Sequence, residues 1–165
     1  STLSTNDAGL ILAIGFFGTS IAGILGGRLL NHLGSRRIGF AGIVITAIGL
    51  CAVSLVNGPD DIPWMLLALF IQGVGTGLFQ TSYMYSITGM LPSDQRGVSG
   101  SITMLTRTIG VVSGVTILTL VFSWLDAEGN EFQESFKFIF NLVGGGLFLF
   151  LLTTLPWPQV WFRKI

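Results

Sequence analysis

The sequence predicts an all-α membrane protein with five transmembrane helices, and three observations support that prediction. Half of the 165 residues are hydrophobic and only 10% are charged, whereas a soluble domain carries about a quarter charged residues. Several apolar runs reach roughly 20 residues, enough for a helix to cross ~30 Å of hydrocarbon. Successive connections between these runs alternate in the sign of their charge. Helices are expected because an isolated strand cannot satisfy its backbone in lipid, and the short alternating segments of a barrel do not occur.

The first three helices are bounded by recognisable start and stop signals. The first follows a capping residue at Ser4 or Thr5, and the second ends before an Asn-Gly-Pro turn. The third has Pro63 in its first turn and Pro92 just beyond its end, as expected for proline at helix boundaries. These signals predict helices over residues 8–30, 38–56 and 63–90.

Two further helices complete the chain. The fourth begins after the Asp94–Arg96 connection and continues to a tryptophan, and the fifth ends before Pro156 and Pro158. Their predicted ranges are 97–124 and 136–155.

The charged residues predict which side of the membrane each end occupies. Basic residues lie in the first and third connections and in the C-terminal tail: Arg28, His32, Arg36 and Arg37, then Arg96, then Arg163 and Lys164. Acidic residues lie near the N-terminus and in the second and fourth connections: Asp7, then Asp60 and Asp61, then Asp126, Glu128, Glu131 and Glu134. Basic residues in short loops favour the cytoplasmic side. We therefore expect a multi-pass protein of the plasma (inner) membrane, with the N-terminus outside and the C-terminus cytoplasmic.

A polar stripe runs along the third predicted helix. Its members recur at helical spacing and fall within about 80° of one another on the helix: Gln72, Thr76, Gln80 and Tyr83. A helix surrounded by lipid has no reason to keep a polar face, so this face meets protein or water. Two interpretations remain open, namely interhelical hydrogen bonding and the lining of a substrate cavity.

The fourth predicted helix carries the residue that is most costly to place in a membrane. Arg107 lies about ten residues into the helix, roughly 15 Å deep, and shares its face with Thr103. An arginine at such depth costs at least about 2.5–3.5 kcal/mol on insertion scales. It is interpreted either as a structural pin between helices or as a residue with a substrate or coupling role.

Small residues spaced four apart predict close helix packing. Such pairs occur in the first, third and fourth helices, at Gly23 and Gly27, Gly73 and Gly77, and Gly110 and Gly114.

The sequence gives no support for catalysis or for a bound cofactor. One histidine and the single Cys51 do not make a metal cluster. The glycine-rich run 73–77 lies inside an apolar helix, without the preceding strand that a nucleotide site requires. No acid–base or nucleophile–base pair occurs within the spans. We therefore expect no enzyme, metal, cofactor or nucleic-acid partner; the expected partners are the lipid bilayer and a small-molecule substrate.

Several motifs resemble those of the major facilitator superfamily. Residues 27–37, GRLLNHLGSRR, resemble the loop motif G-x-L-x-D-R-x-G-R-R that joins the second and third helices of each six-helix half. Its matching positions are Gly27, Arg28, Asn31, His32, Gly34, Arg36 and Arg37. Residues 72–77 resemble the family's fourth-helix pattern, and 92–114 are similar to the next helix of the fourteen-helix drug:proton antiporters.

The resemblance implies the last five helices of a carboxyl-terminal half-bundle, with one helix and the amino-terminal half missing. It further implies that 8–30, 63–90 and 97–124 flank a central cavity, and that the activity is proton-coupled efflux of drugs or amphipathic metabolites by alternating access. A non-transporting membrane scaffold or truncated remnant is the alternative.

Two departures limit what carries over from the family. Asn31 and His32 replace the motif's aspartate and arginine, which indicates a weakened gating loop. The family's membrane acids are absent and Leu69 replaces a basic residue, so proton coupling is expected to use residues outside this chain.

Overall fold

The chain folds into five long helices. The computed structural model describes residues 5–56, 61–90, 96–127 and 132–154. The helices are α1 (Thr5–Leu33), α2 (Ser35–Ser54), α3 (Ile62–Met90), α4 (Arg96–Ala127) and α5 (Phe132–Thr154). All five are long and apolar enough to cross a membrane. The predicted all-helical class with five spans is confirmed.

The helix boundaries agree closely with the prediction, with one informative exception. The largest difference at a helix start is in α5, which begins at Phe132 rather than at residue 136. The exception is the first connection, which was expected to be a loop around residues 31–37. Instead α1 continues to Leu33 and α2 begins at Ser35, so the connection is shorter than predicted.

A single residue, Gly34, makes this turn. Its φ is 79° and its ψ is 150°, a backbone region that is essentially restricted to glycine. Its N–H still donates to Leu30 O at 3.1 Å, and its carbonyl accepts from Ile38 N at 3.4 Å. Both helices therefore run up to the hinge, and α1 and α2 form a helical hairpin.

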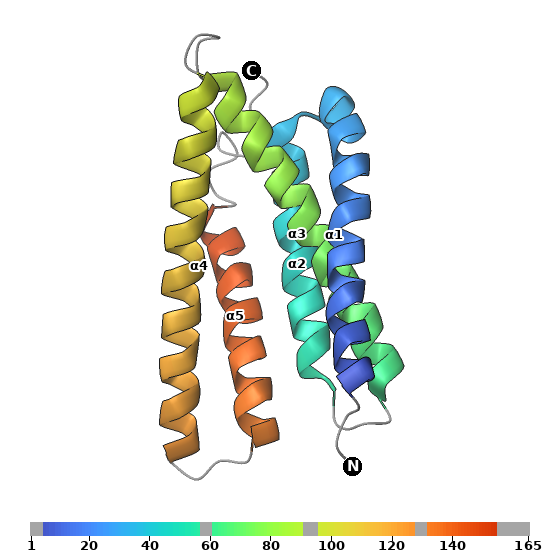
Figure 1. The fold of residues 1–165 in the computed structure, drawn as a ribbon, viewed down its shortest axis with the longest axis vertical. Helices are drawn as coiled ribbons and strands as arrows, with labels where there is room; N and C mark the ends of the chain where they lie inside the picture. Colours follow the sequence, from blue (N-terminus) through green and yellow to red (C-terminus); the bar gives the residue numbers. More distant parts are fainter. Residues whose placement is uncertain (1–4, 57–60, 91–95, 128–131, 155–165) are drawn as a thin grey trace.

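Successive helices run in opposite directions (Figure 1). The end of α1, the start of α2, the end of α3 and the start of α4 lie together at one end of the bundle, at the top of Figure 1. The residues of the first connection, Arg28, His32, Arg36 and Arg37, all lie there, and we call this the basic end. The acidic residues within the described ranges lie at the opposite end: Asp7, Asp61, Asp126 and Glu134.

Glycines bring α3 into close contact with both helices of the hairpin. A Cβ at Gly77 would lie 2.5 Å from Thr19 O of α1, and one at Gly73 would collide with Gly15 O. On the other face of α3, a Cβ at Gly75 would lie 2.7 Å from Gly42 O of α2. Real Cβ contacts are longer than this, so larger residues do not fit. The hairpin thus forms a groove in which α3 lies.

The remaining two helices are attached less evenly. α5 packs on α2, where a Cβ at Gly144 would lie 2.7 Å from Cys51 Sγ. α4 has few contacts with α3 and α5. Only 6% of its most apolar window is buried, compared with 39% for α2. Most α4 side chains therefore face the surroundings of the bundle.

Candidate functional site

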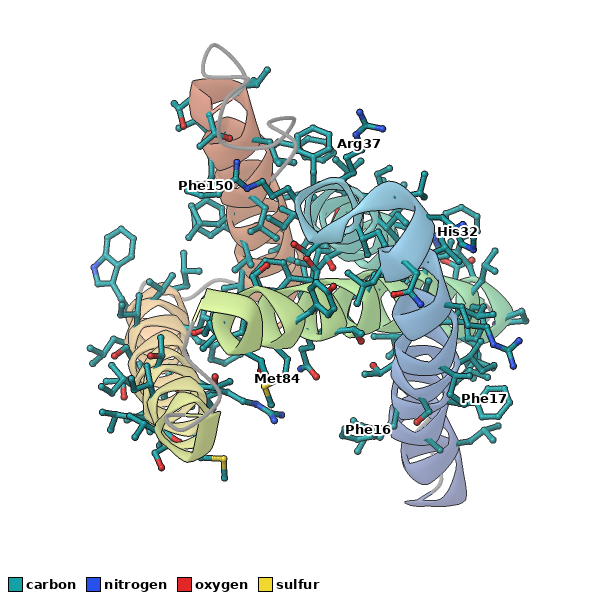
Figure 2. All side chains as sticks on the ribbon, turned by 90° about the horizontal axis from the view of Figure 1, so that it is seen from above. Phe16, Phe17, His32, Arg37, Met84 and Phe150 are labelled. Atoms are coloured by element: carbon teal, nitrogen blue, oxygen red, sulfur yellow. The ribbon has the colours of Figure 1, made fainter. Side chains whose placement is uncertain are left out.

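One side of the bundle is open between α1, α3 and α4. Seen from above in Figure 2, α3 crosses the centre, with α1 and α4 near its two ends and α2 and α5 on its other side. Phe16 of α1 and Met84 of α3 both lie on the open side, with exposed fractions of 72% and 48%. Large apolar side chains are thus presented on this side of the bundle.

The polar stripe of α3 makes mainly local contacts. Gln72 Nε2 donates to Thr76 Oγ1 at 3.2 Å, and Thr76 Oγ1 donates to Gln72 O at 2.9 Å. Gln80 is exposed, and half-buried Tyr83 stacks on Phe79 with ring centroids 6.2 Å apart. These hydrogen bonds and the ring contact lie within one helix. Gln72 also packs closely on α2, where a Cβ added at Gly49 would lie 2.7 Å from Gln72 Cβ. The role of the stripe as a cavity lining stays a prediction.

Other hydroxyl groups, which the sequence reasoning missed, join the helices. Ser82 Oγ of α3 donates to Ser35 O of α2, and Ser86 Oγ donates to Ser35 Oγ at 3.0 Å. Thr19 Oγ1 of α1 donates to Gly73 O at 3.1 Å. The spacing of Ser82 and Ser86, four residues apart on α3, is the one signal that could have revealed the first pair.

Two further polar residues connect α2 to α5. Ser54 Oγ lies 2.9 Å from Asn141 Oδ1 and donates to Cys51 O at 2.7 Å. Ser54 is buried, so these contacts provide hydrogen-bonding partners for a hydroxyl that is shielded from solvent.

The predicted residues of α4 behave differently from those of α3. Thr103 is 8% exposed, whereas Arg107 is exposed, four residues further along the helix. Within the described ranges no helix covers Arg107. Both interpretations, a structural pin against another part of the protein and a substrate or coupling role, stay predictions.

The predicted packing glycines give a mixed result. Gly73 and Gly77 are in close contact with α1, as their spacing suggested. Gly23 is only loosely packed, with Thr81 Oγ1 3.9 Å from an added Cβ. At Gly110 and Gly114 an added Cβ would meet nothing within 4 Å. The expectation that the α4 pair packs against a neighbour is thus not met among the described residues, because α4 has so few contacts there.

The motif residues of the first connection are spread over two helices and the hinge. Gly27, Arg28, Asn31 and His32 lie in the last turns of α1 and are exposed. Arg36 and Arg37 lie in the first turn of α2, where Arg37 is exposed and half-buried Arg36 engages another group. The motif therefore forms two adjoining helix ends rather than an extended loop.

An apolar cavity lies between α4 and α5. Its volume is about 280 Å³, and six residues line it: Leu118, Thr119, Phe122, Phe136, Ile139 and Phe140. The residues lie in the half of each helix that is farther from the basic end. Within the described residues, no group of three or more metal-ligating side chains occurs.

A comparison with protein families identifies the superfamily to which the chain belongs. The sequence model of the Major Facilitator Superfamily matches residues 2–162. The chain belongs to this superfamily. The five apolar helices and the motif over 27–37 are thus parts of a major facilitator fold.

The relatives of this major facilitator chain are named as transporters. It is 26% identical over 113 residues to an uncharacterized MFS-type transporter of Mycobacterium tuberculosis, covering 68% of this chain and 25% of the relative. It is 29% identical over 126 residues to a probable triacylglyceride transporter of Mycobacterium leprae, covering 70% and 25%. The uncharacterized MFS-type transporter YddS of Bacillus subtilis is 28% identical over 130 residues, covering 76% of this chain and 29% of the relative.

These matches cover most of this chain but only part of each relative. The chain spans about a quarter of the length of the curated relatives it matches. No solved structure gives a significant match. Membership of the superfamily favours a transporter over an enzyme, and it identifies the chain as an integral, multi-pass membrane protein.

Proposed function

We propose that the chain forms part of a secondary active transporter that exports amphipathic or lipophilic small molecules by alternating access. The observation that carries this proposal is the open side bounded by α1, α3 and α4. There, Phe16 of α1 and Met84 of α3 are exposed apolar side chains. α3 also carries the polar stripe, and α4 carries Arg107. An amphipathic substrate requires both an apolar surface and a few polar groups.

In this proposal the stripe forms hydrogen bonds with the substrate, and Arg107 binds its polar or anionic part. Gln80 and Tyr83 offer hydrogen-bonding groups that no neighbouring helix engages within the described ranges. Arg107 supplies a positive charge on the next helix, where a polar or anionic part of the substrate would bind. The lipid-like substrate in the name of the Mycobacterium leprae relative supports the lipophilic side of this proposal.

Proton coupling in this proposal depends on residues outside the chain. No Asp or Glu occurs between residues 8 and 59, 62 and 93, 95 and 125, or 135 and 165. The acids of the described ranges lie at one end of the bundle. The proton site would therefore lie in the remaining part of the transporter, and the basic end would lie in the cytoplasm.

Replacing Arg107 tests the proposal. In the full-length protein, Arg107→Ala should lower the rate of efflux by about tenfold or more, because one charged contact with the substrate is lost. Efflux of a lipophilic cation, a lipophilic anion and a neutral lipid analogue from proteoliposomes would be compared at equal protein content. Arg107→Lys is the matched control, and it should retain part of the rate for an anionic substrate because it keeps the charge.

Two outcomes would contradict the proposal. Unchanged efflux by Arg107→Ala would show that Arg107 does not take part in substrate binding. Proteoliposomes of the intact protein that move none of the three probes would instead support a non-transporting membrane scaffold.

A further inference from the structure

The cavity between α4 and α5 has a lining that suits an apolar ligand better than water. Of its six lining side chains only Thr119 is polar, and three are phenylalanines. Two of these, Phe136 and Phe140, are neighbours in the wall, with ring centroids 4.5 Å apart. A buried water needs about two to four polar partners, whereas apolar cavities stay dry and take up apolar molecules.

The cavity has the size of a short alkyl chain and begins close to the membrane interface. Its volume is about 280 Å³, and at ~30 Å³ for a water-sized group it holds roughly nine non-hydrogen atoms. Phe136 lies two residues inside the membrane-length segment of α5, and Leu118 lies seven residues inside that of α4. The lining therefore extends from the interface to ~10 Å into the hydrocarbon.

A buried hydroxyl lies beside the interfacial end of this cavity. Ser135 is 2% exposed, and within the described ranges its Oγ has no hydrogen-bond partner. Ser135 directly precedes Phe136 and lies four residues before Ile139, so Ser135 and Ile139 share one face of α5. Buried hydroxyls are normally hydrogen-bonded. This one can donate to, and accept from, a polar group at the end of an apolar ligand.

The surroundings of Ser135 favour a neutral polar group over a charged one. An ionised group beside a side chain that is 2% exposed would lose most of its hydration, at a cost that a single hydroxyl cannot offset. A neutral hydroxyl loses much less and can exchange both a donor and an acceptor with Ser135.

The cavity is also separate from the open side of the bundle. The open side is marked by Phe16 of α1 and Met84 of α3 (Figure 2), and neither helix contributes to the lining of the cavity. The direct contacts between α4 and α5 are sparse. A ligand that fills the cavity would therefore add contacts between these two helices.

We propose that the α4–α5 cavity binds a neutral lipophilic alcohol of about eight carbons. Its alkyl chain lies among Leu118, Phe122 and Phe140, and its hydroxyl is hydrogen-bonded to Ser135 at the interfacial end. The site is independent of the transported substrate, so it can be tested without a measurement of transport.

Photolabelling of the full-length protein in proteoliposomes tests this proposal. The probe is an octanol that carries a diazirine in its chain, and peptide mass spectrometry locates its adducts after illumination. Adducts should fall on residues 118–122 and 136–140. Unlabelled 1-octanol should suppress them at about one-fifth of the membrane concentration that octane requires, because the hydrogen bond to Ser135 adds about fivefold in affinity. Octanoate and octylamine, which are ionised, should suppress them less than 1-octanol does.

Three outcomes of this experiment would overturn the proposal. Adducts absent from both segments would show that the cavity is closed, or filled by protein, in the complete transporter. Suppression by octane and 1-octanol at equal concentrations would exclude a hydrogen bond at the site. Stronger suppression by octanoate or octylamine than by 1-octanol would exclude a neutral alcohol as the preferred ligand.

Replacing the hydroxyl tests the role of Ser135 directly. Ser135→Ala should abolish the advantage of 1-octanol over octane, and it should leave the melting temperature unchanged or slightly raised, because it removes a buried hydroxyl without a protein partner. Ser113→Ala, at an exposed serine of α4 outside the lining, is the matched control and should keep the advantage. An unchanged advantage in Ser135→Ala would contradict the proposed bond. A lowered melting temperature would show that the hydroxyl is bonded within the complete protein, which would also contradict it.

Filling the cavity gives a second, independent test. Leu118→Trp should reduce the adducts on both segments to background, because the larger side chain occupies the site. Leu120→Trp is the matched control, since Leu120 is 65% exposed and lies outside the lining, and its labelling should be unchanged. Persistent labelling in Leu118→Trp would contradict a ligand in this cavity. If Leu118→Trp does not fold, the competition between 1-octanol and octane in the unaltered protein decides the question.

Discussion

α3 and α4 have similar sequence features and very different surroundings. Each carries a polar face and a pair of glycines four residues apart. Yet Gly73 and Gly77 of α3 lie against the backbone of α1, whereas Gly110 and Gly114 of α4 have nothing within 4 Å of an added Cβ. The same local pattern therefore has one structural meaning in α3 and another in α4. Spacing alone identifies a face that can pack closely, and only the neighbouring helices determine whether it does.

The α1–α2 hairpin accounts for this difference. Gly34 reverses the chain in a single residue, so α1 and α2 form a groove that receives α3 on both of its faces. Within the described ranges the main contacts of α4 are with α3 and α5, and they are sparse. In a bilayer, helices associate through packing and hydrogen bonds rather than through the hydrophobic effect. α3 is therefore the best-anchored helix of the chain, and α4 is available for contacts with other partners.

The largest expected difference between α3 and α4 comes from replacing a glycine with a larger residue. Gly73→Leu should destabilise the protein by about 3 kcal/mol or more, because the side chain collides with the backbone of α1 at Gly15. The melting temperature of the full-length protein in detergent, read by fluorescence-detected gel filtration, measures the loss.

Gly110→Leu is the matched substitution in α4, and it should change the melting temperature little because the site is open. If Gly73→Leu kept the melting temperature of the unaltered protein, the proposed close contact of α3 would be refuted. An equally large loss in both would show that α4 packs against a part of the transporter outside this chain.

The hinge that forms the groove gives the next largest effect. Gly34→Ala should destabilise the protein by ~1–3 kcal/mol, because its φ of 79° and ψ of 150° strain any residue with a Cβ. Gly27→Ala is the control. It lies inside α1 with nothing within 4 Å of an added Cβ, and alanine there should be neutral or slightly stabilising. Equal melting temperatures for the two variants would contradict a hinge that depends on a positive φ.

Much of the fold could be predicted from the sequence, because lipid allows few alternatives. Apolar runs of membrane length with proline at their ends predicted five helices, and α3 ends at Met90 as expected. The α1–α2 connection was predicted to be longer than it is, because basic residues and glycines suggest a loop. The chain needs only one residue, Gly34, in a backbone conformation that composition does not reveal.

The site was less predictable, because its contacts depend on which helices are neighbours. The stripe from Gln72 to Tyr83 was visible as a periodic pattern. Whether its side chains bond within α3 or across to another helix depends on rotation about the helix axis, which periodicity does not fix. Ser82 and Ser86, which do contact α2, were hidden among many small residues.

The smallest effect that distinguishes α3 from α4 comes from removing one hydroxyl. Ser82 is 4% exposed, and its Oγ donates to Ser35 O across the α2–α3 contact. Ser82→Ala should therefore lower stability by ~0.5–1.5 kcal/mol, the net worth of an intramolecular hydrogen bond. Thr106→Ala in α4 is the matched control, because Thr106 Oγ1 donates only to Ile102 O, one turn earlier in its own exposed helix. Its loss should stay within ~0.5 kcal/mol, as for other exposed substitutions. If Thr106→Ala lowered the melting temperature as much as Ser82→Ala, interhelical hydrogen bonding would not explain how α3 is held, and glycine packing would have to account for it alone.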